Sequence, residues 1–204
     1  GVTWTDLTTL GVAARYLPSG YIFDGSGPSA FMDSKYLSYI LGLVNFKFTS
    51  YLSKILNPTL HFTLSDFGNI PFIFSKNDTI NQIVENSIIL SKFEWNSRES
   101  TWDFQQNELI RISSNDASAD FSTSLEESFD LYQQYWRNKF FQLHKNEEEL
   151  NRQFIEIYGL QGELTPHVPL EDITILQDEL DRKTLAKLNK KLARHPETQL
   201  VSNY

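Results

Sequence analysis

Hydrophobic residues recur three and four positions apart over residues 34–56, as they do on one face of a helix. The spacing therefore predicts a helix over this range, with a bend near Asn45. Asp33 or Ser34 would cap its start, because a short polar side chain at that position accepts a hydrogen bond from the first turn. Asn57 would end it, since the residue before a proline avoids helical backbone angles.

A second hydrophobic stripe, in the C-terminal half, predicts a much longer helix. Its members are spaced by steps of four and three, and they are Phe121, Leu125, Phe129, Tyr132, Trp136, Phe140 and Leu143. Steps of this kind form a heptad pattern. Ser124 and Glu127 have the spacing of a capping box, so the ordered helix is expected to begin there. The stripe resumes at Leu150 after an interruption at Asn146, and Gly159 ends the helix.

The same periodicity predicts two shorter helices. One spans residues 78–93, with an apolar face formed by Ile80, Ile83, Val84 and Ile88. The other spans residues 177–194 and carries the densest basic run of the chain: Arg182, Lys183, Lys187, Lys190, Lys191 and Arg194. This run would contact a phosphate backbone or an acidic partner, or it is the solvated face of an amphipathic helix, which is the more common role.

Alternating apolar and polar residues predict strands in the N-terminal half. Residues 12–16 and 20–24 would form a hairpin around the turn residues between them. Leu60, Phe62 and Leu64 alternate with polar residues, which is typical of a half-buried strand.

Together these elements predict an α+β fold. A small mixed-sheet domain with packed helices is expected over residues 1–115, and a long-helix, hairpin-like extension over residues 116–204. The polar stretch over residues 113–120 would separate them, because such clusters usually form loops.

Composition narrows the class of protein. The 15 Phe, 9 Tyr and 4 Trp supply enough apolar area for a packed core. The absence of cysteine excludes disulfides, cysteine-ligated metal centres and a cysteine nucleophile. No stretch is long and apolar enough to span a membrane, and the N-terminus lacks a signal-peptide pattern. We therefore expect a cytoplasmic protein, and a chain that starts with Gly1 fits a segment of a longer one.

The net charge of −8 argues against a nonspecific nucleic-acid binder. The charge is uneven, however. Residues 1–115 hold 8 basic and 10 acidic residues, whereas residues 116–204 hold 10 basic and 16 acidic residues. A local basic face therefore remains compatible with the first part of the chain.

The common catalytic and metal-binding motifs are absent from the sequence. It has no phosphate-binding loop, no Gly-x-Ser-x-Gly and no His-Glu-x-x-His. Its four histidines are scattered, without the spacing of metal ligands. Asn57-Pro58 is followed by Thr59-Leu60, so it does not match the Asn-Pro-Pro-Tyr loop of amino-methyltransferases. We therefore assign no catalytic residue, cofactor site or metal site to this chain.

Basic and amide side chains in the first part form a candidate DNA-binding set: Arg15, Lys35, Asn45, Lys47, Lys54 and Asn57. Lys47 and Lys54 are seven positions apart, so they would share a helix face with Tyr51 between them. Lys and Arg neutralise phosphates, and amides and Arg read base edges. The alternative is ordinary surface charge.

Four stretches of the chain resemble one family. They are YILGLVNFK, LNPTLHFTLSDFGNIP, EWNSRESTWDF and NEEELNRQFIEIYGLQGELTPHVPLEDITI. In this order they are similar to the adenine-specific DNA methyltransferases of BREX (bacteriophage exclusion) defence systems, of the PglX type. The similarity covers most of the chain and lies after the catalytic domain of the family, while the first stretch is shared more loosely with Type IIG specificity domains. Phe46 departs from the family, where a small polar residue is more usual.

The resemblance implies a target-recognition region with a helical extension. The intact enzyme would transfer a methyl group from S-adenosylmethionine to the N6 atom of adenine in double-stranded DNA, and its catalytic and cofactor loops would lie upstream. The implied partners are DNA, the upstream catalytic domain and other defence proteins. The alternative is a helical protein-interaction and scaffolding module of the same complex, which the heptad stripe motivates.

Overall fold

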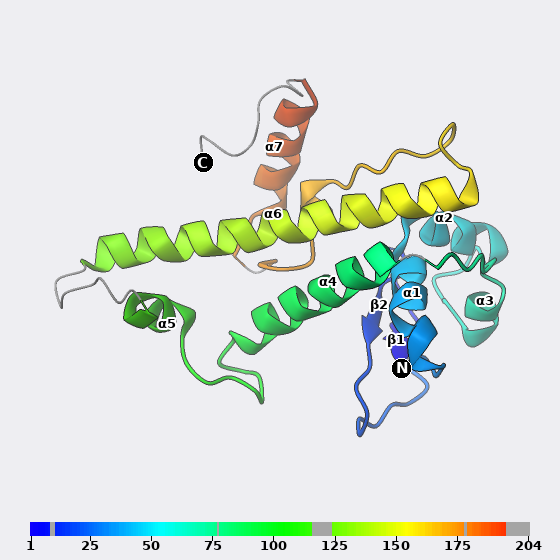
Figure 1. Cartoon of the computed structure of the whole chain (residues 1–204), viewed down its shortest axis with the longest axis horizontal. Helices are drawn as coiled ribbons and strands as arrows, with labels where there is room; N and C mark the ends of the chain where they lie inside the picture. Colours follow the sequence, from blue (N-terminus) through cyan, green and yellow to red (C-terminus); the bar gives the residue numbers. More distant parts are fainter. Residues whose placement is uncertain (9–10, 77, 116–123, 178, 195–204) are drawn as a thin grey trace. The chain divides into compact units, whose positions relative to one another are not determined.

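The computed structural model of the chain describes residues 1–8, 11–76, 78–115, 124–177 and 179–194, and within them the fold is α+β, as predicted (Figure 1). The chain forms two compact units, each drawn from separate stretches of sequence. Unit 1 consists of Gly1–Ile88 and Glu148–His167, and unit 2 of Ile89–Glu147 and the described part of Val168–Tyr204. The expected boundary between a recognition domain over residues 1–115 and a helical extension over residues 116–204 stays a prediction.

Unit 1 contains the sheet and most of the short helices. Its elements are β1 (Val2–Trp4), β2 (Ala14–Tyr16), β3 (Ser29–Ala30), α1 (Ser34–Asn45), α2 (Lys47–Leu56), α3 (Leu64–Gly68), the start of α4 (Asp78–Asn96) and the end of α6 (Leu125–Tyr158).

The sheet is antiparallel with the strand order β2-β1-β3. Val2 lies opposite Tyr16 and Ala30, and Thr3 lies opposite Arg15 and Ser29. The predicted hairpin is wrong, because residues 20–24 form no strand and β2 pairs with the N-terminal residues instead. A strand as short as β1 gives too few alternating positions for the pattern to be recognised in the sequence.

The caps and the bend of the predicted 34–56 helix are confirmed. The Asp33 carboxylate accepts a hydrogen bond from the Lys35 amide and caps α1. The helix breaks at Phe46, which is extended (φ −63°, ψ 132°) and separates α1 from α2. Asn57 then ends α2, as its proline neighbour predicts.

The predicted strand over Leu60, Phe62 and Leu64 is wrong. Only His61 forms an isolated bridge, to Leu7, and α3 begins at Leu64. Thr63 and Asp66 make a capping box, whose reciprocal hydrogen bonds start a helix where the alternation indicates a strand.

The core of unit 1 closes around Phe154 at the end of α6. This side chain is fully buried, and its ring lies 5.3 Å from that of Tyr39 and 5.4 Å from that of Phe46. Gly42 of α1 allows the close approach, because a Cβ atom there would lie 3.3 Å from the Phe154 ring and 3.0 Å from Val84. Residues far apart in the sequence therefore share one core.

Unit 2 is helical. It consists of the end of α4, α5 (Glu108–Asn115), the first two thirds of α6, the short 3-10 helix η1 (Leu170–Asp172) and α7 (Arg182–Arg194). The prediction of a linker over residues 113–120 is wrong for residues 113–115, which belong to α5, and the rest of it lies outside the described residues. The predicted helix over 78–93 is observed as α4. The predicted helix over 177–194 is observed as α7, which begins at Arg182 rather than at residue 177.

The heptad stripe of α6 is buried over only part of its length. Trp136, Phe140 and Leu143 are buried in the core of unit 2, together with residues of the 168–176 segment. Leu125 and Phe129 are 77% and 47% exposed, and Phe121 lies outside the described residues. The predicted capping box is present, since Ser124 and Glu127 exchange hydrogen bonds, and Gly159 (φ +67°) ends the helix.

Glu147 is an unusual acidic group in unit 2. Burial, with the nearby carboxylate of Asp172 as a second cause, raises its pKa from 4.5 to about 7. Between these two pH values the folded state keeps a proton that the unfolded state has released. The free energy of unfolding therefore falls as the pH rises through this window.

Replacing Phe154 with alanine should lower the free energy of unfolding by about 3–5 kcal/mol, because it leaves a cavity in a closed core. Phe129→Ala, on the exposed part of the same helix, is the matched control and should cost about 1 kcal/mol or less. Urea denaturation followed by circular dichroism measures both. Equal losses would mean that Phe154 does not close the core.

Glu147→Gln should remove the fall in stability between pH 4.5 and pH 7, because the amide carries no titrating proton. At pH 8 the variant should be more stable than the natural protein by up to about 3 kcal/mol. Thermal unfolding at pH 5 and at pH 8 tests this. A variant that loses stability at both pH values would contradict the assignment.

Candidate nucleic-acid interface

The solvent face of the sheet carries polar side chains. Val2 and Trp4 point into the core and are fully buried, so Thr3 between them points to the other face. Its neighbours in register are Arg15 of β2 and Ser29 of β3. Hydroxyls and a guanidinium group therefore occupy one row across the three strands. The Thr3 and Ser29 hydroxyls donate to the carbonyls of Pro28 and Gly27, both at 3.1 Å, so Arg15 is the group of this row with the chemistry to contact a phosphate.

Arg15 is the cation of this row and is exposed. Its guanidinium group donates a hydrogen bond to the Thr5 hydroxyl at 3.0 Å, and it has other N–H donors for a ligand. Arg15 is a candidate from the sequence, whereas Thr3, Thr5 and Ser29 are not. The alternation of Val2-Thr3-Trp4-Thr5 is too short to predict a strand, so no signal in the sequence points to the two threonines.

Asn45 holds β2 in place. Its side-chain oxygen accepts a hydrogen bond from the Ala14 amide at 2.9 Å, and its side-chain nitrogen donates to the Ala14 and Leu41 carbonyls, both at 3.0 Å. The Asn45 side-chain amide thus pairs with the free edge of β2. Its donors and its acceptor are the groups that would otherwise form hydrogen bonds with a base edge. Asn45 orients Arg15 through the neighbouring residue rather than facing a ligand itself.

Lys47 has a similar internal role at the start of α2. Its ammonium group donates hydrogen bonds to the carbonyl oxygens of Thr165 and His167, both at 2.7 Å. Asn151 of α6 donates to the Pro166 carbonyl at 3.1 Å, so the two side chains together hold the 165–167 segment. The segment lies 118 or more positions away in sequence, which explains why sequence spacing could not reveal this role.

Lys54 is the cation of α2 that reaches solvent. It is exposed, and its ammonium group has no ion-pair or hydrogen-bond partner among the described residues. Tyr51, 61% exposed, precedes it by three positions, which places both on one side of the helix. Lys35, at the start of α1, is also exposed but pairs with Asp33 at 3.4 Å.

Asn57 belongs to a turn network. Its side-chain nitrogen donates to Asp66 at 3.0 Å and to the His61 carbonyl at 3.3 Å, and its oxygen accepts from Thr59. Burial alone would raise the pKa of Asp66, but the hydrogen bonds from Asn57 and Thr63 outweigh it and lower the pKa. This keeps the carboxylate charged, as a helix cap at α3 requires.

The structure therefore divides the six candidate residues into two groups. Arg15, Lys35 and Lys54 present cations to solvent, while Asn45, Lys47 and Asn57 use their polar atoms within unit 1. The segment that leads into β2, the strand with Arg15, lies beside α2. The Val12 amide in this segment donates a hydrogen bond to the Ser50 hydroxyl of α2 at 3.1 Å.

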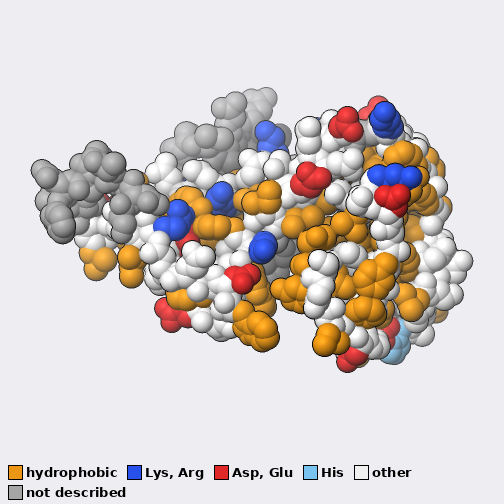
Figure 2. Space-filling model, turned by 60° about the horizontal axis from the view of Figure 1, so that its bottom comes forward, with side chains coloured by type: hydrophobic (Ala, Val, Ile, Leu, Met, Phe, Trp, Pro, Cys, Tyr) orange, Lys and Arg blue, Asp and Glu red, His pale blue; other side chains and the backbone are white. Residues whose placement is uncertain are grey.

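The face of the chain drawn in Figure 2 has its Lys and Arg side chains scattered singly, among many hydrophobic ones. It shows no continuous basic stripe. Electrostatic attraction for a phosphate backbone on this face is therefore weak, and a few cations have to provide it.

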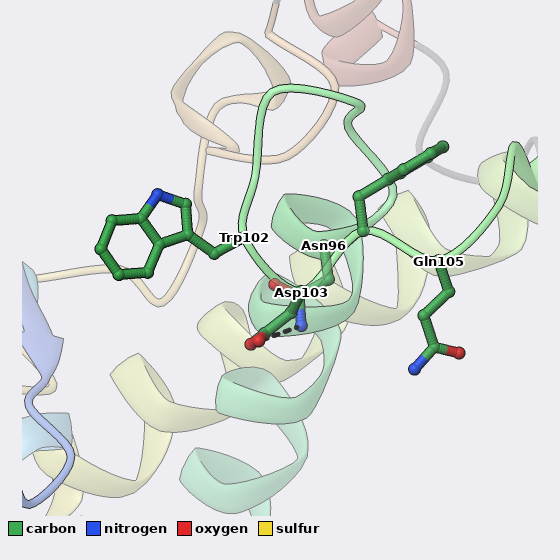
Figure 3. A pocket seen from close by; sticks show the side chains of 5 residues that line it. Asn96, Trp102, Asp103 and Gln105 are labelled. Atoms are coloured by element: carbon green, nitrogen blue, oxygen red, sulfur yellow. Dashed lines mark hydrogen bonds between the residues drawn. The ribbon is translucent and has the colours of Figure 1, made fainter.

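A shallow hollow lies in unit 2, in the loop after α4, and has a volume of about 430 Å³ (Figure 3). Asn96 and Asp103 face each other across its floor, 3.5 Å apart, while Trp102 lies to one side and is fully exposed. The lining contains one carboxylate, two amides and two aromatic rings, which do not form a nucleophile, a general base or a metal site.

The described residues contain no group of three or more histidine, aspartate or glutamate side chains placed to bind a metal ion. None of the helices in these ranges combines the length and the hydrophobicity that a bilayer-spanning segment needs.

No family model matches the chain. Among curated proteins, the chain is 34% identical over 182 residues to the adenine-specific methyltransferase PglX of Lacticaseibacillus casei (strain Zhang), which covers 89% of this chain and 15% of that protein. It is 31% identical over 192 residues to the adenine-specific methyltransferase BrxX of Escherichia coli O9:H4 (strain HS), covering 93% of this chain and 15% of that protein. The chain thus spans about 15% of the length of the curated relatives that it matches, and it is homologous to one segment of the adenine-specific methyltransferases PglX and BrxX.

Proposed function

We propose that this chain is the target-recognition segment of an S-adenosylmethionine-dependent DNA methyltransferase that modifies the N6 atom of adenine in a BREX-type phage-defence system. The observation that carries the proposal is the similarity of nearly the whole chain to one segment of two adenine-specific methyltransferases. Such an enzyme works on DNA in the cytoplasm.

The proposed division of labour has a physical basis. A methyltransferase must flip the adenine out of the base stack before it can react. A separate module must fix the register on the duplex through phosphate contacts and a few base contacts. In this proposal the catalytic loops and the S-adenosylmethionine site belong to other parts of the longer protein, and unit 1 of this chain contacts the double-stranded DNA.

Within unit 1, the proposal gives the six candidate residues two kinds of role. Arg15 and Lys54 contact phosphates, with Lys35 as a weaker contributor because Asp33 already pairs with it. Asn45, Lys47 and Asn57 position the elements that carry these cations. The hydroxyls of Thr3 and Ser29 lie in register with Arg15, but they donate to the carbonyls of Pro28 and Gly27, both at 3.1 Å, so they hold the loop before β3 rather than a phosphate.

A protein-interaction role is the second candidate, and one observation favours it. At the start of α6, Leu125 and Phe129 lie four positions apart on one helix face, and they are 77% and 47% exposed although they belong to the heptad stripe. Exposed apolar side chains grouped on a helix are typical of a surface that binds another protein. Another protein of the same defence system is the partner that this alternative proposes.

Lys54→Met should weaken DNA binding and reduce the dependence of log Kd on log salt by about 0.9, the value for the loss of one phosphate contact. Fluorescence anisotropy of a labelled duplex across a salt series measures both quantities, on this chain and on the longer protein. Lys92→Met, an exposed lysine of α4 in unit 2, is the matched control and should leave the slope unchanged. Absence of salt-dependent binding by both proteins would overturn the proposal.

Lys47→Met should give the opposite pair of results. The salt slope should stay the same, because the ammonium group binds the carbonyls of Thr165 and His167 rather than phosphate. The free energy of unfolding should fall by about 1–2 kcal/mol, since hydrogen bonds to a charged donor are lost. Anisotropy and urea denaturation of the same preparation test both points, and a lowered slope with unchanged stability would place Lys47 on the DNA instead.

A further inference from the structure

The loop between β2 and β3 carries three exposed hydrophobic residues, and a fourth directly follows β3. Ile22 is 99% exposed, Tyr21 and Phe31 are each 64% exposed, and Phe23 is 50% exposed. We call these four residues the apolar tip. Single exposed hydrophobic residues are common, but three consecutive large ones beside a fourth form a patch, and patches mark interaction surfaces.

The loop holds the apolar tip in a defined conformation. At the base of the loop, the Gly1 ammonium group donates to the Leu17 carbonyl at 2.9 Å, and the Trp4 amide donates to the Pro28 carbonyl at 3.2 Å. Beyond the tip, the Asp24 carboxylate accepts hydrogen bonds from the amide and hydroxyl of Ser26 and from the Gly27 amide.

The rings of the tip also contact each other. Those of Phe23 and Phe31 lie 5.1 Å apart and are tilted by 48°. The tip is therefore presented to solvent by a structured turn, rather than collapsing onto the sheet.

The charge around the apolar tip decides which class of macromolecule it fits. Residues 16–34 contain no Lys or Arg, and their two charged residues are Asp24 and Asp33. The hydrogen bonds from Ser26 and Gly27 lower the pKa of Asp24, so this residue is negative at neutral pH. A wedge that inserts into DNA approaches phosphates, and an acidic loop without cations would be repelled. The surroundings of the tip therefore favour an apolar protein surface.

We propose that the apolar tip packs against another segment of the same longer polypeptide, one that lies outside these 204 residues. The length of the relatives argues for this partner, because the chain matches only 15% of each of them and the rest is available to cover the tip. Permanent contacts are also more hydrophobic than transient ones, and an uncharged aromatic and aliphatic surface fits the permanent kind. The inference rests on the proposed function only in taking the chain to be part of such a methyltransferase.

This contact would give the apolar tip a positioning role. The tip is joined to β2, which carries Arg15, by a few residues. A tip fixed on the remainder of the enzyme would therefore fix the sheet that carries the phosphate contacts. The distance between the recognised sequence and the methylated adenine depends on such a fixed connection.

Hydroxyl-radical footprinting with mass spectrometry tests the inference, because it reports the exposure of individual Tyr, Phe and Ile side chains. It compares the longer methyltransferase, free of DNA, with the 204-residue chain. We expect the oxidation of Tyr21, Phe23 and Phe31 to be at least fivefold lower in the longer protein. Equal oxidation in the two proteins would overturn the inference, and so would protection that appears only after a duplex is added, since the tip would then contact DNA.

A matched pair of variants in the longer protein distinguishes the loss of this contact from a general loss of folding. Ile22→Asp places a charge in the proposed contact and should restore the oxidation of Phe23 and Phe31 to the level of the isolated chain. Leu64→Asp is the control: it is 58% exposed, and an acidic residue in the first turn of α3 is favourable. Protection that survives Ile22→Asp would overturn the inference. The salt dependence of DNA binding is measured separately, so failure of the proposed function would be seen there and not in the footprint.

Discussion

The core of unit 1 depends on residues 148–167, which comprise the end of α6 and the segment after it. Without residues 148–167, Tyr39 and Phe46 would face solvent where Phe154 now covers them. The same residues also supply polar contacts, since the Lys47 amide donates to Asn151, 104 positions later, and the Lys47 ammonium group holds the 165–167 segment. These bonds sit at the junction of α1 and α2, so the helices that carry or orient the candidate cations are fixed by residues far along the sequence.

The helices were predictable because each is long enough to repeat its pattern of hydrophobic residues several times. Local interactions between neighbouring residues determine the 34–56 pattern, the bend near Asn45 and the capping box at Ser124 and Glu127, so these features can be recognised in the sequence. The sheet was not predictable for the opposite reason. Its strands have two or three residues each, and β1 pairs in register with residues 10–14 and 26–28 positions away, so only tertiary contacts define them.

The candidate site shows the same limit at the level of side chains. Sequence gives the residue types from which the six candidates were chosen, but it does not give their partners. Asn45, Lys47 and Asn57 resemble DNA-reading residues in type, yet each satisfies backbone or side-chain groups of its own unit. A buried or edge polar group that lacks a partner costs free energy, and the fold uses these side chains to avoid that cost.

Under the proposed function, the small number of candidate cations that face solvent has a consequence for how the enzyme would select DNA. With few phosphate contacts, nonspecific affinity is low, and a recognition unit with low nonspecific affinity contributes mainly by its position. Position in turn requires a firm attachment to the part of the enzyme that holds the adenine. The proposed contact of the apolar tip, in the connection that follows the strand with Arg15, would meet this requirement, because apolar packing gives a fixed attachment without adding charge that would bind DNA at random.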